Sequence, residues 1–326
     1  MPRYVLKNLE YLLSTFDDSE VYFISDSISS VNKAAKIGVK TWLAPNPDQQ
    51  WRDVREQLNH PMSFRQGFWF KTLARIFVLN SFMQLHKNES CLQIEADVFL
   101  FRDFPLSKVF NLDAEIAFPM ESSEMGIASL LYLKDHKSAQ SLTDFALDAI
   151  QINPQITDMS LLGGIAHSKI LKFVPLPTLP ESLKGALSQP EAINLVCQNS
   201  LSDTGVFDGI TIGQYLLGVD PRNSRGKLIL HRIQPSHAIN PEKLSFTWDG
   251  DENLSLEAPN RNSQIYNLHN HAKDLRLYKK KSRNRLLQKR ISSSKKGETK
   301  EFKVQIFITV ALKAIRRRAR IALKRK

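Results

Sequence analysis

The hydrophobic and polar positions of the chain follow two periods, which divide much of it into helices and strands. Apolar residues recur at intervals of three and four over positions 3–16, 68–83 and 136–151, which predicts three helices. Positions 21–26 and 91–101 are rich in β-branched and aromatic residues, which predicts two strands. We therefore expect an α/β protein.

Two acids, Glu95 and Asp97, are the most informative residues of the predicted strand over 91–101. Side chains alternate along a strand, so these acids share one face with Gln93. Two carboxylates near the end of a buried strand are costly unless a cation neutralises them, and oxygen ligands suit divalent ions. The pattern thus predicts a metal site. The alternative is a carboxylate pair that caps a turn and pairs with Arg102.

The order of elements here is an aromatic-rich helix, a short loop and a strand that ends in acids. This order resembles the nucleotide-sugar half of the GT-A glycosyltransferases. Three later segments, 126–133, 157–162 and 265–273, look like the family in the same order. The resemblance covers roughly residues 4 to 273 and implies a Rossmann-like mixed sheet flanked by helices. The chain begins at a helix where the family opens with a strand, so we expect the first strand to be missing.

In that family an acidic motif, often Asp-x-Asp, binds a divalent metal and the donor diphosphate. The resemblance implies that Glu95, Asp97 and a late histidine hold Mn2+ or Mg2+, although Glu replaces the first Asp of the motif. His269 and His271 are two apart, so in a strand they share a face and either could be the ligand. The alternative for each is a histidine without a metal.

Five further residues are candidates for donor binding or catalysis. Lys71 and Arg75 are neighbours on the helix over 68–83 and could neutralise a diphosphate, while Arg75 could equally pair with a nearby acid. Asp26 ends the strand at 21–26 and is a third candidate for donor binding. Asp158 and Asp208 are candidates for a base that acts on an acceptor hydroxyl, the alternatives being a helix cap and a turn residue.

The resemblance implies a metal-dependent glycosyltransferase that moves a sugar from a nucleotide-sugar donor to a glycan or lipid-linked acceptor. One alternative is a catalytically degenerate GT-A-like protein that binds a glycan or a partner without turnover. The other is a nucleic-acid-binding protein that acts through a basic tail, although the sequence shows no recognisable nucleic-acid-binding module.

Positive charge is concentrated at the C-terminal end of the chain. The formal net charge is +12, but residues 273–326 hold 21 Lys or Arg and 3 acids, while residues 1–272 hold 24 and 30. We expect a GT-A-like body over 1–273, a basic flexible linker over 274–300 and a basic amphipathic helix over 301–326. Such a helix is typical of a segment that lies on an anionic membrane surface.

The cysteine content and the apolar runs bear on the cellular compartment in which the protein works. Cys91 and Cys197 both lie among apolar residues, which fits a reducing cytosol better than a disulfide framework. The start of the chain does not resemble a signal peptide, and no apolar run approaches the ~20 residues that span a bilayer. We expect a cytoplasmic protein, held peripherally at the inner face of the membrane.

Overall fold

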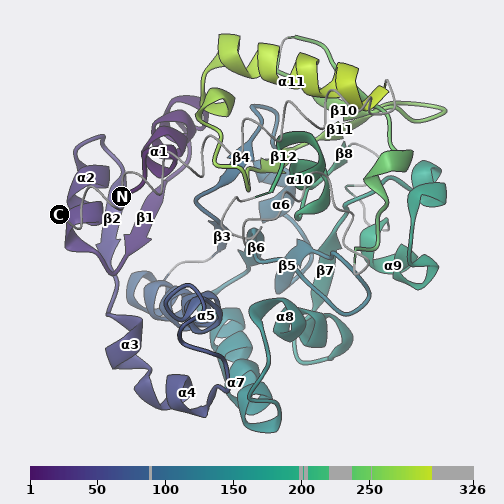
Figure 1. The fold of residues 1–326 in the computed structure, drawn as a ribbon. Helices are drawn as coiled ribbons and strands as arrows, with labels where there is room; N and C mark the ends of the chain where they lie inside the picture. The colour runs from purple at the N-terminus through teal and green to yellow at the C-terminus, as the bar shows by residue number, and fades with distance from the viewer. Residues whose placement is uncertain (88–89, 198–200, 202–204, 220–236, 251, 296–326) are drawn as a thin grey trace.

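The structure is a computed structural model with mixed α/β architecture, in which small sheets are flanked by helices (Figure 1). It describes residues 1–295 except 88–89, 198–200, 202–204, 220–236 and 251. The amphipathic helix predicted at 301–326 lies outside the described residues. None of the described helices is both long enough and apolar enough to cross a membrane.

The central sheet has the strand order β3-β6-β5-β7, with β3 at Cys91–Ile94, β6 at Leu130–Leu133, β5 at Ile116–Pro119 and β7 at Phe173–Leu176. It is mixed, because β5 pairs parallel with β7 while β6 pairs antiparallel with both β3 and β5. Every residue of β5 and β6 is buried, as expected for central strands covered on both faces.

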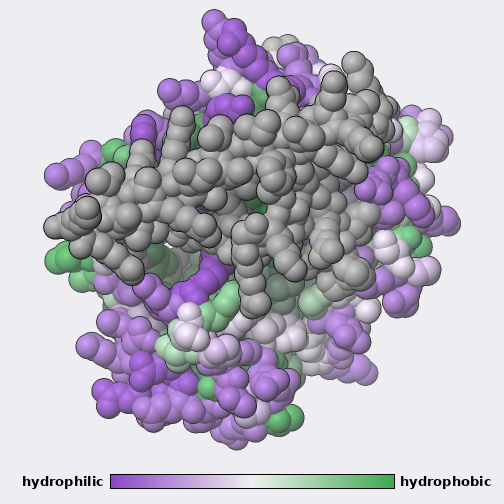
Figure 2. All heavy atoms as spheres, in the orientation of Figure 1, coloured by the Kyte–Doolittle hydropathy of each residue, from purple (hydrophilic) through white to green (hydrophobic). Residues whose placement is uncertain are grey.

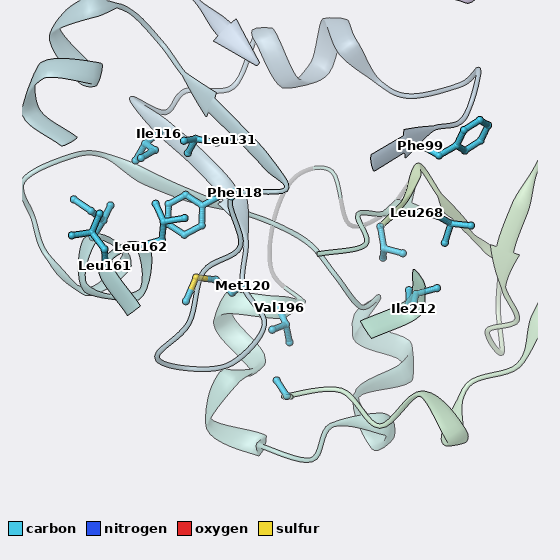
Figure 3. Close-up of a cluster of buried hydrophobic side chains, with 14 of the residues drawn as sticks. Phe99, Ile116, Phe118, Met120, Leu131, Leu161, Leu162, Val196, Ile212 and Leu268 are labelled. Carbon is cyan, nitrogen blue, oxygen red and sulfur yellow. The ribbon is translucent and has the colours of Figure 1, made fainter. Parts of the chain in front are cut away.

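Three helices lie on one side of this sheet, namely α5 at Phe68–His86, α7 at His136–Ile152 and α8 at Asp158–His167 (Figure 1). Phe118 of β5 packs between the sheet and the α8 residues Leu161 and Leu162 (Figure 3). These buried side chains belong to the main hydrophobic core, and burying such apolar surface drives the layers together.

Three further sheets lie in the described part of the chain. The strands β4 at Val98–Leu100 and β12 at Asn267–His269 pair antiparallel. A four-stranded sheet has the order β8-β11-β10-β9, with strands at Gly205–Val206, Ser263–Ile265, Leu254–Leu256 and Phe246–Trp248. The parallel pair β1 at Tyr22–Ser25 and β2 at Lys40–Leu43 lies beside α1 at Arg3–Thr15 and α2 at Ile28–Ala35 (Figure 1).

The remaining helical segments are short, apart from the last. The α-helices are α3 at Pro47–Gln50, α4 at Arg52–Gln57, α6 at Leu106–Phe110, α9 at Ile193–Val196, α10 at Thr211–Leu217 and α11 at Lys280–Lys295. The 3-10 turns are η1 at Glu181–Ala186, η2 at Pro190–Ala192, η3 at Pro241–Lys243 and η4 at Leu275–Tyr278.

The helices predicted at 3–16, 68–83 and 136–151 are confirmed, but the single strand predicted at 91–101 is wrong. The chain forms β3, turns at 95–97 and continues as β4 in a different sheet. The amide of Val98 donates to the carbonyl of Glu95 at 2.9 Å across that turn, and the side-chain amide of Asn8 donates to the carbonyl of Val98 at 2.8 Å. The two acids therefore meet through a turn and not through the alternation of one strand.

The flexible linker predicted at 274–300 is also corrected, because α11 occupies Lys280–Lys295. Leu286, Leu287 and Ile291 of this helix are buried in the main core. The Lys- and Arg-rich composition had favoured a solvated segment, yet a few apolar positions on one side were enough to attach it to the body.

The described surface on the face drawn in Figure 2 is mostly hydrophilic, and its hydrophobic residues are scattered in small groups. The acidic turn at 95–97 and the late histidine segment come together through the pairing of β4 with β12.

Candidate metal centre

The acidic turn and the closing histidine segment are brought together by one strand pair. Val98 of β4 stands opposite His269 of β12 in the antiparallel register. The amide of Asn270 donates to the carbonyl of Asp97 at 2.7 Å, which extends this contact past the strand ends. Residues about 170 positions apart in the sequence thus form one cluster.

Three side chains of this cluster could hold a metal ion. Asp97, His269 and His271 each offer one ligand atom, and these atoms all lie within 4.8 Å of one another. The two imidazole rings are stacked with their centroids 3.8 Å apart. The structure therefore joins the histidines to Asp97, as the sequence predicted, whereas Glu95 is not in this three-residue group.

The hydrogen bonds of His269 determine which nitrogen faces the cluster. Its Nδ1 lies 2.8 Å from the carbonyl oxygen of Gly209, which can only accept, so Nδ1 carries the proton. Its Nε2 lies 3.2 Å from Oε2 of Glu95 and 3.6 Å from Oδ2 of Asp97. Nε2 is therefore the nitrogen that faces the acids: in the charged ring it directs a proton at them, and in the neutral ring its lone pair could bind a metal ion.

His271 differs from its neighbour in its surroundings. Its Nε2 is buried and has no hydrogen-bond partner among the described residues. Burial and the charge of His269 hold the pKa of His271 well below its ordinary value, so this ring is neutral. A buried ring nitrogen without a hydrogen-bond partner is costly in a folded protein, whether it carries the proton or the lone pair.

Burial opposes the charged form of His269, but the adjacent Glu95 outweighs it and keeps the pKa of His269 above its ordinary value. The same neighbourhood acts on Glu95: burial raises its pKa, but Arg75 and His269 together hold it well below the usual range. Glu95 is therefore ionised, and a cation at Nε2 of His269 is favoured in this place.

Lys273 is a member of the cluster that the sequence reasoning missed. Its ammonium forms an ion pair with Oδ2 of Asp97, and burial lowers the pKa of Lys273 to about 8. The sequence places this lysine two positions after His271, which was the available signal. It lies at the end of the predicted closing segment 265–273, but no role in the site was predicted for it.

Arg75 and Asp158 lie on the other side of Glu95. Nη1 of Arg75 bonds Oε1 of Glu95, and its Nη2 bonds Oδ2 of Asp158. Arg75 thus pairs with nearby acids, the alternative that its sequence position left open. Arg75 and Lys273 are the cations beside the two acids of the turn, where the alternative from sequence had named Arg102.

The helix cap at the start of α8 belongs to Thr157. Its hydroxyl oxygen accepts from the amide of Ser160 at 3.2 Å, and the hydroxyl of Ser160 binds back to the amide of Thr157 at 3.0 Å. This capping box leaves Asp158 as the first helical residue, buried and directed at Arg75. Asp158 is therefore not the cap that its alternative had proposed.

Asp208 is buried and fixed to the backbone directly behind His269. Its carboxylate accepts from the amides of Ile212 at 2.9 Å, Gly213 at 2.8 Å and His269 at 2.8 Å. Burial raises the pKa of Asp208 to about 6, against the three amides that favour its charged form. These hydrogen bonds hold the loop before α10 against β12.

Lys71 and Asp26 are exposed, and the structure does not place either among the contacts of the metal cluster described above. Lys71 lies one helical turn before Arg75 on α5, and Asp26 follows β1. Their assignment to donor binding stays a prediction.

A second buried polar group, which the sequence reasoning did not find, lies behind the loop at 208–213. The hydroxyl of Thr211 bonds Glu121, and Nδ1 of His237 lies 2.9 Å from that hydroxyl. Burial raises the pKa of Glu121 well above its usual range and lowers the pKa of His237 to about 4. Both groups are thus held neutral in the fold. The signal in the sequence was an acid directly after the strand-like 113–119 segment.

Family models, curated proteins and solved structures were compared with the chain, and none of them matches it.

Proposed function

We propose that this protein is a metal-dependent glycosyltransferase, which moves a sugar from a nucleotide-sugar donor to a glycan or lipid-linked acceptor. The observation that carries the proposal is the convergence of Asp97 with His269 and His271, whose ligand atoms lie within 4.8 Å of one another. The unpartnered Nε2 of His271 supports a ligand at this point, because the described residues leave its lone pair unused.

The donor atoms favour one kind of ion. Carboxylate oxygens suit both Mg2+ and Mn2+, whereas imidazole nitrogen suits transition metals better than Mg2+. A set of one carboxylate and two imidazoles therefore fits Mn2+ better than Mg2+. Glu95 lies beside Nε2 of His269 but outside the three-residue ligand group, and its position is that of the Glu that replaces the first Asp of the motif.

The chemistry of glycosyl transfer suits these side chains. A bound divalent ion would stabilise the negative charge that develops on the departing diphosphate. Lys273 would add positive charge at the same place, since its ammonium already lies against Asp97. The order of α5, the acidic turn and the closing histidine segment resembles that of the GT-A glycosyltransferases, and this resemblance selects the reaction.

One contact favours the alternative of a GT-A-like protein that binds without turnover. Asp158 is a candidate base, but it is buried and ion-paired with Arg75. A carboxylate held in this way is a poor base unless the pair opens when substrate binds. Turnover of the donor is therefore the measurement that separates the two functions.

The first experiment measures Mn2+ binding to the full chain by calorimetry, with Asp97→Asn and His271→Gln beside the wild type. His136→Gln is the matched control, since His136 is exposed on α7. We expect both cluster variants to lose at least tenfold in Mn2+ affinity and the control to lose none. Undiminished Mn2+ binding by Asp97→Asn would overturn the site.

The second experiment screens nucleotide sugars for release of nucleoside diphosphate, with and without Mn2+. The glycosyltransferase proposal expects slow Mn2+-dependent release for one donor, and its loss in Asp97→Asn. Donor binding without any release, across all acceptors tested, would support the non-catalytic alternative.

A further inference from the structure

Arg75 joins three elements of the fold at the metal centre. It extends from α5, bonds Glu95 in the turn after β3 and bonds Asp158 at the start of α8. Its Nε donates to the carbonyl of Thr72 at 3.0 Å, so each of the three guanidinium nitrogens has a hydrogen-bond partner. Such a planar fork fixes geometry far better than a lysine at the same place would.

We propose that Arg75 is a positioning residue, which holds the Glu95 carboxylate beside Nε2 of His269, so that its negative charge lies next to the ligand nitrogen and attracts the metal ion. This inference rests on the proposed function, because it needs the metal site. It gives Arg75 a different task from the neutralisation of a donor diphosphate that its sequence position had suggested.

The two carboxylate oxygens of Glu95 have different partners, and this is the first observation that supports the positioning role of Arg75. Arg75 takes Oε1, and Oε2 lies 3.2 Å from Nε2 of His269. The amide of Glu95 donates to the carbonyl of Ser129 at 2.9 Å, which fixes the backbone from which the side chain extends. With Arg75 on one oxygen, rotation of the carboxylate away from His269 would break an ion pair.

His269 is then held from two sides. Its Nδ1 is bonded to the carbonyl of Gly209 at 2.8 Å, and its Nε2 faces the acids. Gly209 thus orients the ring through Nδ1, while Glu95 adds negative charge beside Nε2. Removal of such outer groups typically changes metal affinity by about 10- to 100-fold, and Arg75 acts one step further out, through the position of Glu95.

Asp158 completes the clamp from the opposite side. It is 4% exposed, and its pairing with Nη2 keeps the guanidinium from turning away from Glu95. The helix that carries it is itself fixed, because Gly163 of α8 packs so closely on the backbone at Glu124 that a methyl group there would overlap the carbonyl oxygen. The position of Glu95 is thus fixed by contacts with two packed helices, α5 and α8, and not by the turn alone.

The experiment measures affinity for Mn2+ alone, with no nucleotide present, in the full chain. The variants are Arg75→Lys, Arg75→Met and Asp158→Asn, and the matched control is Arg52→Met, since Arg52 is exposed on α4. We expect Arg75→Met to bind Mn2+ about 10- to 100-fold more weakly, with Arg75→Lys and Asp158→Asn showing smaller losses. The control should match the wild type.

A double-mutant cycle with Glu95→Gln separates positioning from general destabilisation. If Arg75 acts through Glu95, the loss in Mn2+ affinity from Arg75→Lys should largely vanish in the Glu95→Gln background. A loss of the same size in both backgrounds would overturn the proposal. Should Arg75→Met fail to fold by circular dichroism, Arg75→Lys and Asp158→Asn still decide the outcome.

The opposite result has a clear signature. If Arg75 instead contacts the donor diphosphate, Mn2+ affinity stays within twofold of the wild type in all three variants, while nucleotide-sugar affinity at saturating Mn2+ falls. That pattern would overturn the positioning role and leave the proposed function standing. Absence of Mn2+ binding by the wild type would overturn the metal site, and this inference with it.

Discussion

Arg283 provides the sharpest test of the finding that α11 belongs to the folded body. This side chain is 1% exposed, although it comes from a segment of the chain crowded with lysine and arginine. Nη2 lies 2.8 Å from Oε1 of Glu252, and Nη1 donates to the carbonyl of Leu277 at 3.0 Å. The guanidinium also stacks over the ring of Phe99 at 4.9 Å and that of Tyr11 at 5.6 Å.

Arg283→Met removes all these contacts and nearly preserves the volume. Breaking a buried ion pair by removing one partner typically costs about 3–5 kcal/mol. Two features reduce the cost here: the carboxylate of Glu252 is partly exposed, and Lys280 remains 3.8 Å from it. The lost donor to Leu277 and the lost cation–π contacts add to the cost. We expect a loss of about 3 kcal/mol in the free energy of unfolding.

Urea denaturation followed by circular dichroism measures this loss. Arg285→Met is the matched control, because Arg285 lies two positions further along the same helix and is exposed. We expect the control to stay within about 0.5 kcal/mol of the wild type. If Arg283→Met is as stable as Arg285→Met, α11 does not pack on the body as described. The segment would then be the flexible linker that the sequence predicted.

Three further predictions follow from other parts of the fold. Gly163→Ala should lower the free energy of unfolding by about 2–3 kcal/mol, because the added methyl group clashes with the backbone at Glu124 and this cost exceeds the ~1 kcal/mol gain in helix propensity. Thermal denaturation measures this loss, with Gly185→Ala as the control, since a methyl group there meets nothing within 4 Å. His237 is held neutral with its pKa lowered to about 4, so protonation favours unfolding, and its contribution to stability is lost as pH falls from about 6.5 towards 4. His237→Asn should therefore lose less stability than the wild type over that window in urea titrations; parallel curves would contradict this reasoning. Full-length protein should sediment with anionic vesicles at low salt better than a chain ending at residue 295, a cut that spares the core residues of α11; equal sedimentation would remove the membrane role of the tail.

Much of the fold near the site could be predicted from local patterns. The helix that carries Arg75 has a long apolar periodicity, and the capping box at Thr157 spans only the four residues 157–160. The meeting of Asp97 with the late histidines could be predicted only through the family resemblance. Local periodicity contains no information on which distant segments pair, so β4 and β12 could not have been matched from pattern alone.

The errors have a common physical origin in tertiary contacts. The run 91–101 is dominated by strand-forming residues, although Glu95, Ala96 and Asp97 are weak ones. Asn8 and the carbonyl of Ser129 bond the backbone on either side of the turn that these three residues form. The segment at 280–295 has a composition typical of a solvated linker, yet Arg283 finds an acid and two aromatic faces in the body. In both places, partners remote in sequence override the local preference.

His271 bears on the choice between the two interpretations of the acidic turn. If Glu95 and Asp97 were only an ion-paired turn, Arg75 and Lys273 would be sufficient partners, since each acid already has its own cation. That interpretation leaves His271 unexplained. Its Nε2 is buried and without a hydrogen-bond partner among the described residues, and its ring is stacked on an imidazole that faces both acids. A cation shared by Asp97 and the two rings would satisfy this nitrogen, and this is the observation that favours the proposed metal site over the ion-paired turn.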